Sequence, residues 1–199
     1  MMLGTPNQSR VRFTGPVLAT VVLAAVTAAG CRPKAGTFPQ VLSFGNEALA
    51  RARAWSREGM EGAVYLRPGE SLPGAGLQVG VIRSTRYHTP RTLHSWIRGQ
   101  LDQSRMSRYH DSGGIGEACM VGLAPTGPAS GRAFILLHLC NADARRAVCV
   151  EADEEFPSAD LGSAIQTPGR FEAACSERWG ARRALLESLA SQALRWQPR

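Results

Sequence analysis

The chain has 199 residues, of which 23 are Lys or Arg and 16 are Asp or Glu, so its formal net charge is +7. Its length suits one domain plus a leader, and the 44% hydrophobic and 20% charged residues exclude a disordered chain. The five cysteines are too few for a disulfide-dense miniature protein. The only lysine, Lys34, is not part of a Gly-Lys-Ser/Thr sequence, which excludes a phosphate-binding P-loop.

Residues 1–30 have the pattern of a secretory signal peptide. Arg10 and Arg12 make residues 1–12 positive, and residues 13–30 carry no charge. As a helix, the apolar core at 17–29 would reach only about 20 Å, short of a hydrocarbon layer of roughly 30 Å. An uncleaved membrane anchor and a secreted protein cut at an Ala-x-Ala-like site are the alternatives.

The leader ends in the sequence Ala28-Ala29-Gly30-Cys31. This stretch resembles the processing motif of bacterial lipoproteins, in which small residues precede an invariant cysteine, although Ala28 stands where leucine is usual. The resemblance covers residues 1–31 and implies that Cys31 is lipidated and becomes the mature N-terminus. Two or three acyl chains would then hold the protein stably on a membrane. Arg32 follows where an aspartate would retain an enterobacterial lipoprotein at the inner membrane, so the outer membrane, facing the periplasm, is favoured.

Residues 31–40 are interpreted as the lipidated N-terminus and a polar linker, and residues 41–199 as one domain. A helix capped by Ser43 or Asn46 is expected to run to about residue 57, because apolar residues from Phe44 to Trp55 recur at helical spacing. Strands are expected near 62–66 and at 77–84. Thr89 and Pro90 form a cap and a first helical position, which predicts a helix over 90–104.

In the second half, a loop is expected at 109–116, followed by strands near 117–123, 132–140 and 146–151. An acidic stretch from Glu151 is expected to be a solvated loop, and a closing helix is expected over 168–196. The predicted fold is therefore α+β: one mostly antiparallel sheet of about five strands with three helices, in the order α-β-β-α-β-β-β-α. This order resembles the roadblock-type fold and other profilin-like sandwiches, but it carries no motif and implies no function.

Without Cys31, four cysteines remain, and an oxidising compartment would join them into two disulfides. Cys119 lies in an expected strand and Cys175 on the apolar side of the closing helix, so these two can meet where the helix covers the sheet. Cys149 lies on the strand face opposite its valine neighbours and is expected to point outward and pair across a hairpin with Cys140. The expected bridges are therefore Cys119–Cys175 and Cys140–Cys149, one of three possible arrangements.

Three neighbouring residues, His110, Asp111 and Ser112, offer a base, an acid and a nucleophile, followed by two glycines. Catalytic triads assemble from separated segments, so a polar turn explains these residues without catalysis. A hydrolase using this loop remains the alternative.

No metal or cofactor is expected. The histidines His88, His94, His110 and His138 show no ligand spacing, and the chain has no C-x2-C pair, so the sequence speaks against zinc. The acidic residues after Val150 lack the alternation and the glycine of a calcium loop. His138, within an apolar strand, is expected to be a hydrogen-bonded core or surface residue.

Arg91, Arg98 and Arg105 recur every seven residues and would form a stripe along one helix. The stripe is either a solvated helix face or a contact with an anionic lipid or an envelope protein. Nucleic acid is not expected as a partner, because the leader takes the protein out of the cytoplasm.

The sequence therefore favours a lipid-anchored bacterial cell-envelope protein with a non-enzymatic binding or accessory domain. An envelope hydrolase using His110, Asp111 and Ser112, or a lipoprotein toxin or immunity factor, are the alternatives.

Overall fold

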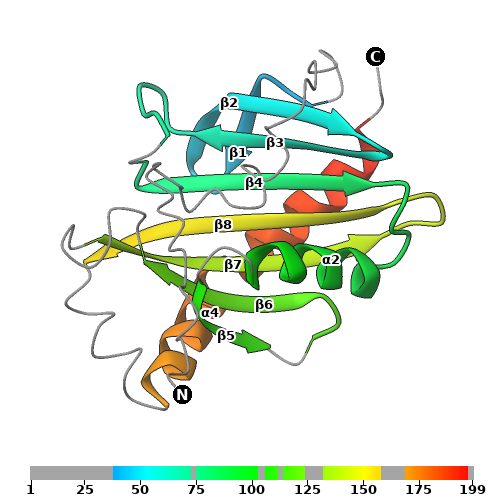
Figure 1. Cartoon of the computed structure of the whole chain (residues 1–199). Helices are drawn as coiled ribbons and strands as arrows, with labels where there is room; N and C mark the ends of the chain where they lie inside the picture. The colour runs from blue at the N-terminus through cyan, green and yellow to red at the C-terminus, as the bar shows by residue number, and fades with distance from the viewer. Residues whose placement is uncertain are drawn as a thin grey trace, which may run out of the picture.

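The computed structural model describes residues 38–72, 75–102, 106–111, 114–123, 132–157 and 169–196. These residues form one twisted sheet with a helix on each face (Figure 1). The strands are β1 (Val41–Phe44), β2 (Glu47–Arg57), β3 (Met60–Leu66), β4 (Leu77–Ser84), β5 (Met106–Asp111), β6 (Glu117–Leu123), β7 (Arg132–Ala142) and β8 (Ala147–Pro157). The helices are α2 (Pro90–Asp102) and α4 (Arg170–Arg195). Among these residues, no helix is long and apolar enough to cross a membrane.

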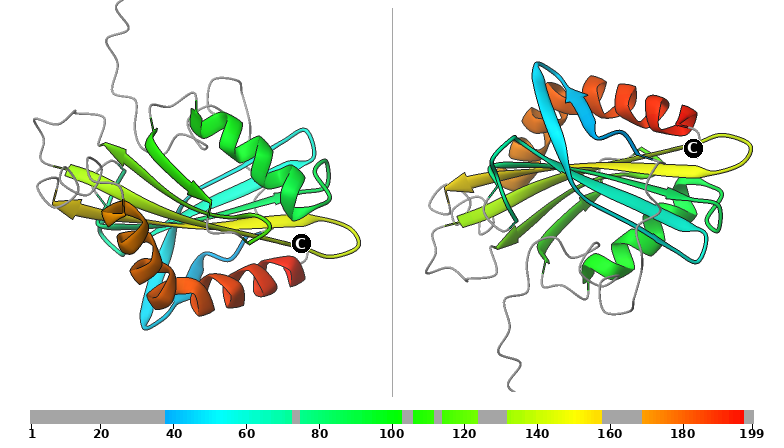
Figure 2. Two further views of the ribbon diagram at one scale, coloured as in Figure 1. Left: turned by 90° about the horizontal axis from the view of Figure 1, so that it is seen from below. Right: turned by 90° about the horizontal axis from the view of Figure 1, so that it is seen from above.

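The eight strands follow the order β1-β2-β3-β4-β8-β7-β6-β5, and every neighbouring pair is antiparallel. The sheet thus consists of two four-stranded meanders joined where β4 pairs with β8. Helix α2 connects the first meander to the second, and α4 follows the second. The two helices cover opposite faces of the sheet (Figure 2). Every residue of β4 is buried, because this central strand has a helix-covered core on both sides.

Side-chain alternation along the strands divides the core in two. On the α4 side, Val79 and Val150 pack with Phe171 and Leu186 of the helix. On the α2 side, residues such as Ile82 pack with Leu93 and Ile97. A sheet buried on both faces accounts for the high proportion of apolar residues in strands β4 and β7.

The predicted fold, with about five strands and three helices in the order α-β-β-α-β-β-β-α, is wrong: the described residues form eight strands and two helices. The expected helix ending at residue 57 is instead the β1–β2 hairpin, which turns at Gly45 with a φ of 62°. A register shift between Arg51 and Arg53 changes which face later residues of β2 occupy. Leu49 consequently packs on the α4 side and Trp55 on the α2 side, and their spacing imitates a helix.

Two expected loops are also strands. Strand β5 occupies part of the predicted loop at 109–116, and β8 continues through the predicted acidic loop to Pro157. The carboxylate of Glu154 on β8 is paired rather than only solvated: it forms ion pairs with Arg178 at 3.1 Å and Arg182 at 2.6 Å on α4. These ion pairs compensate for the low strand propensity of glutamate.

The start of α2 is where the cap predicted it. The hydroxyl of Thr89 accepts a hydrogen bond from the backbone N–H of Thr92 at 3.2 Å, and Pro90 takes the first helical position. The closing helix begins at Arg170, where the carboxylate of Glu172 accepts a hydrogen bond from the backbone N–H of Gly169 at 2.6 Å.

Candidate functional site

The structure places only some of the residues singled out in the sequence. Cys31, Arg105 and Ser112 lie outside the described residues. Arg91 and Arg98 are exposed on α2. The residues of the expected acid–base loop, His110 and Asp111, are the last two of β5, and only their backbone is described.

Both expected disulfides are present. Cys119 of β6 is joined to Cys175 of α4, and Cys140 of β7 is joined to Cys149, its direct cross-strand partner on β8. The expectation that Cys149 points outward is wrong, because it is fully buried beneath α2. The alternation along β8 correctly predicts that Cys149 lies on the face opposite its valine neighbours. That face is not exposed, because α2 covers it and forms a second hydrophobic core.

A pocket of about 210 Å³ lies where the β2–β3 hairpin meets α2. The hairpin turns through Glu58 and Gly59, whose φ angles of 48° and 77° suit a tight two-residue turn. The indole of Trp55 lies against Gly62, where an added Cβ would come within 2.6 Å of the ring. The seven residues that line this tryptophan pocket are Trp55, Arg57, Glu58, Met60, Arg86, Trp96 and Gln100.

The tryptophan pocket combines aromatic walls with cationic donors. Trp96 stacks on Tyr87 with ring centroids 5.9 Å apart, which steadies one wall. Arg57 and Arg86 each donate to a carboxylate oxygen of Glu58 at 3.3 Å, so two cations share one anion. Such a pocket suits an apolar or aromatic group that carries a negative charge. The pocket could not be read from the sequence, because it joins three separate segments and Trp55 was assigned to a helix.

A second group of polar side chains is buried beneath α2. His138 of β7 is completely buried, and its Nδ1 lies 3.2 Å from Oε1 of Glu151 on β8. Its Nε2 lies 2.9 Å from the Sγ of Cys140. The ring of His94, from α2, lies over His138 with centroids 5.1 Å apart. We call His94, His138, Cys140 and Glu151 the His138 cluster.

Next to this cluster, Asp153 is only 6% exposed, and its Oδ1 has no hydrogen-bond partner in the described part of the chain. Burial raises the pKa of Asp153 well above its usual range, and the nearby carboxylates of Glu151 and Glu154 add to the rise. A buried carboxylic acid whose ionised form is disfavoured costs stability wherever the pH forces it to ionise.

The Asp153→Asn variant is expected to be more stable than the wild type at pH 7, by roughly 1–3 kcal/mol. The folded chain binds the Asp153 proton more tightly than the unfolded chain, so this group's contribution is fully present below the unfolded pKa of about 3.9. That contribution is lost as the pH rises towards the folded pKa. Asparagine does not ionise, so the variant does not suffer this loss of stability. Urea unfolding between pH 3 and 8 should show the gain appear above about pH 4.

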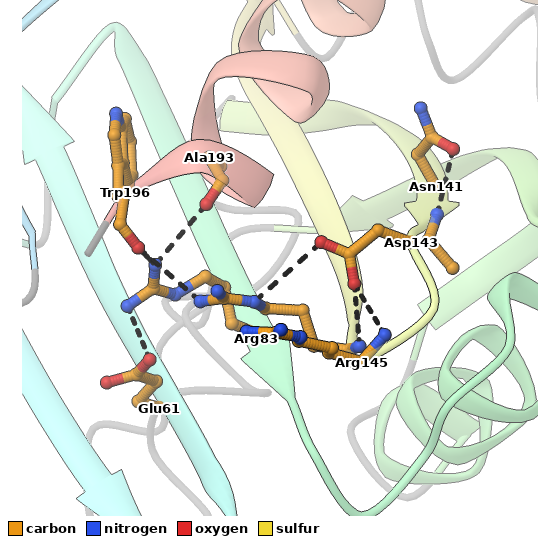
Figure 3. Close-up of polar contacts among 9 residues, drawn as sticks. Glu61, Arg83, Asn141, Asp143, Arg145, Ala193 and Trp196 are labelled. Atoms are coloured by element: carbon orange, nitrogen blue, oxygen red, sulfur yellow. Dashed lines mark hydrogen bonds and ion pairs between the residues drawn. The ribbon is translucent and has the colours of Figure 1, made fainter. Parts of the chain in front are cut away.

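Asp143 provides a control of opposite sign. The backbone N–H groups of Arg145 and Arg146 donate to its Oδ1 at 2.7 and 3.0 Å (Figure 3), and they lower the pKa of its carboxyl group. Its contribution is present above the unfolded pKa and lost in acid, so Asp143→Asn should lower stability at neutral pH. A lower stability of Asp153→Asn at pH 7 would contradict the assignment of a costly buried carboxylate.

The other face of the sheet holds a buried cation, Arg83, which is 1% exposed. Its guanidinium contacts Glu61 and donates to the backbone carbonyls of Ala193 at 3.3 Å and Trp196 at 2.7 Å (Figure 3). Burial lowers the pKa of Arg83, while Glu61 acts to raise it. Because both terminal nitrogens of its guanidinium are directed to Glu61 and to the end of α4, Arg83 fastens the helix to the sheet.

Comparisons of the chain with models of protein families, with curated proteins and with solved structures find no match.

Proposed function

We propose that the chain is a lipid-anchored protein of the bacterial cell envelope, tethered through Cys31, with a domain that binds a partner rather than transforming a substrate. The leader and the small residues before Cys31 support the anchor. The two disulfides support a location outside the reducing cytoplasm. The favoured location is the outer membrane, facing the periplasm.

The observation that carries the binding role is the tryptophan pocket. Its indoles offer apolar surface, and Arg57 and Arg86 offer more positive charge than Glu58 neutralises. The exposed Arg91 and Arg98 lie on the same helix as Trp96 and add to the positive field. The proposed partner is therefore an acidic envelope protein or an anionic lipid that inserts an apolar group between the indoles.

The anchor is tested on protein purified from its native cell. The mature chain should begin at Cys31 with the added mass of acyl chains and should enter the detergent phase. Cys31→Ser should move the protein to the aqueous phase. A mature chain that begins elsewhere, or that stays aqueous without substitution, would overturn the anchor.

The same tethered protein tests the pocket. Cross-linking in the envelope should capture a partner, and the double variant Trp96→Ala with Arg86→Ala should capture at least about tenfold less, as expected for the loss of anchor residues of an interface. Arg145→Ala, which removes an exposed arginine from the β7–β8 turn at the same end of the sheet but outside the pocket lining, is the matched control and should capture normally. Equal capture by the pocket variant would reject the pocket as the binding site, whatever the outcome for the anchor.

A further inference from the structure

We propose that His94, His138, Cys140 and Cys149 form a site for a zinc-like transition metal ion when the Cys140–Cys149 disulfide is reduced. This site is independent of the binding role proposed above. It uses two imidazoles and two thiolates, a donor set typical of four-coordinate zinc. The disulfide and the metal site would be alternative states of the same side chains.

The geometry brings the donor atoms together from three elements. The potential ligand atoms of His94, His138 and Cys140 lie within 4.8 Å of one another. Cys149, bonded to Cys140 in the oxidised state, adds a second sulfur to the group. A tetrahedral ion at about 2.0–2.3 Å from each donor places the donor atoms about 3.3–3.8 Å apart. Binding therefore requires the ligand atoms of His94, His138 and Cys140 to adjust and the two sulfurs to separate once their bond is reduced.

The orientation of His138 is a second, independent indication. A metal-binding histidine commonly donates its other ring N–H to a carboxylate, which fixes the ring and its tautomer. Here Nδ1 faces Glu151 at 3.2 Å, which leaves Nε2 facing the sulfur of Cys140 at 2.9 Å. Glu151 thus satisfies the buried Nδ1 and leaves Nε2 directed at the sulfur pair, which is the orientation that a metal-binding histidine needs.

The burial of the group suits a closed site. His138 and Cys149 are fully buried, and Cys140 is nearly so. His94 of α2 is half-buried, so it is the most exposed of the four proposed ligands. The sequence missed this site because His94 and His138 are 44 positions apart and become neighbours only where α2 crosses β7.

The chemistry balances as two steps. A dithiol donor supplies two electrons and two protons, which break the Cys140–Cys149 bond to give two thiols while the donor becomes a disulfide. The metal ion then displaces both thiol protons and binds two thiolates and two neutral imidazoles. In an oxidising compartment the disulfide state prevails, and a dithiol donor opens the metal state.

The test uses the purified full-length chain, reduced by a phosphine without oxygen and titrated with Co²⁺. One equivalent should produce the strong visible bands of a tetrahedral ion and a thiolate-to-metal charge-transfer band. The oxidised chain should produce neither. Addition of Zn²⁺ should remove the bands, and bound Zn²⁺ should raise the Tm of the reduced chain.

Variants assign the ligands. Cys140→Ala with Cys149→Ala should abolish the bands, and His94→Ala or His138→Ala should weaken Co²⁺ binding by at least about tenfold. Glu151→Gln should weaken it by roughly 10–100-fold while keeping the bands. His88→Ala, an exposed histidine just before α2, is the matched control and should bind normally.

Two results would overturn the proposal. One is a reduced wild-type chain that keeps its circular dichroism spectrum but gives no thiolate band. The other is a band that survives in Cys140→Ala with Cys149→Ala, which would assign the metal to Cys119 and Cys175. If the His138 variants fail to fold, the half-buried His94 decides: unchanged Co²⁺ affinity in His94→Ala would exclude the four-ligand site.

Discussion

Arg83→Met is expected to lower the free energy of unfolding by about 3–5 kcal/mol. The substitution keeps the length of the side chain but removes the positive charge from a site that is 1% exposed. It leaves Glu61 without its buried partner and removes the hydrogen bonds that Arg83 donates to the carbonyls of Ala193 and Trp196. Among the residues that the structure describes, only the longer bonds remain there, from Trp196 N–H to Ala193 and from Arg146 to Trp196, both at 3.4 Å. Urea unfolding followed by circular dichroism measures the loss.

The matched control is Arg86→Met, three positions after Arg83 in the chain. Arg86 is exposed and pairs with Glu58 at 3.3 Å, and exposed ion pairs contribute about 0–1 kcal/mol. The two variants remove the same charge, so the difference between them isolates the effect of burial. A cost for Arg83→Met as small as that for Arg86→Met would show that the guanidinium does not fasten α4.

The role of Arg83 also explains why a buried cation here is not a sign of catalysis. Its guanidinium lies 4.8 Å from the ring centroid of Phe38, and Phe38 in turn packs edge-on against Trp196. The group thus connects the start of the described chain, the central strand β4 and the end of α4. These contacts all join structural elements of the fold. The tryptophan pocket and the His138 cluster lie on the other face of the sheet.

Features determined by a few neighbouring residues could be predicted from the sequence. The Thr89–Pro90 start of α2 follows from a hydroxyl and a fixed φ angle, which act within one helical turn. The hairpin that joins Cys140 to Cys149 follows from alternation and proximity along the chain. The bridge between Cys119 and Cys175 could be predicted from the side-chain alternation of one strand and the apolar side of one helix.

Features determined by distant segments could not be predicted. The register shift between Arg51 and Arg53 depends on pairing with β3. Because the sequence does not reveal this shift, the spacing of the apolar residues in β2 is interpreted as that of a helix. The acidic end of β8 reads as a loop because its partners Arg178 and Arg182 lie on a helix more than 20 positions away. The tryptophan pocket and the His138 cluster likewise exist only after α2 packs onto the sheet.

Removal of the Cys119–Cys175 disulfide is expected to cost more stability than removal of Cys140–Cys149. In the chain-entropy model, a bridge stabilises by restricting the unfolded chain, and the effect grows with the length of the closed loop. The sequence separations are 56 and 9 residues, which correspond to about 4 and about 2.7 kcal/mol. Urea unfolding of the two double Cys→Ala variants measures the difference.

The comparison is informative because both bridges are buried, so each double variant loses a similar amount of packing. The shorter bridge joins residues that the β7–β8 hairpin already brings together, whereas the longer bridge ties β6 to α4 across the core. Its loss should therefore loosen the helix as well as release the unfolded chain, and the backbone amides around position 175 should exchange hydrogen faster. If the Cys140–Cys149 variant proved the less stable of the two, loop entropy would not be the dominant effect, and the contacts of His138 with that sulfur pair would have to supply the difference.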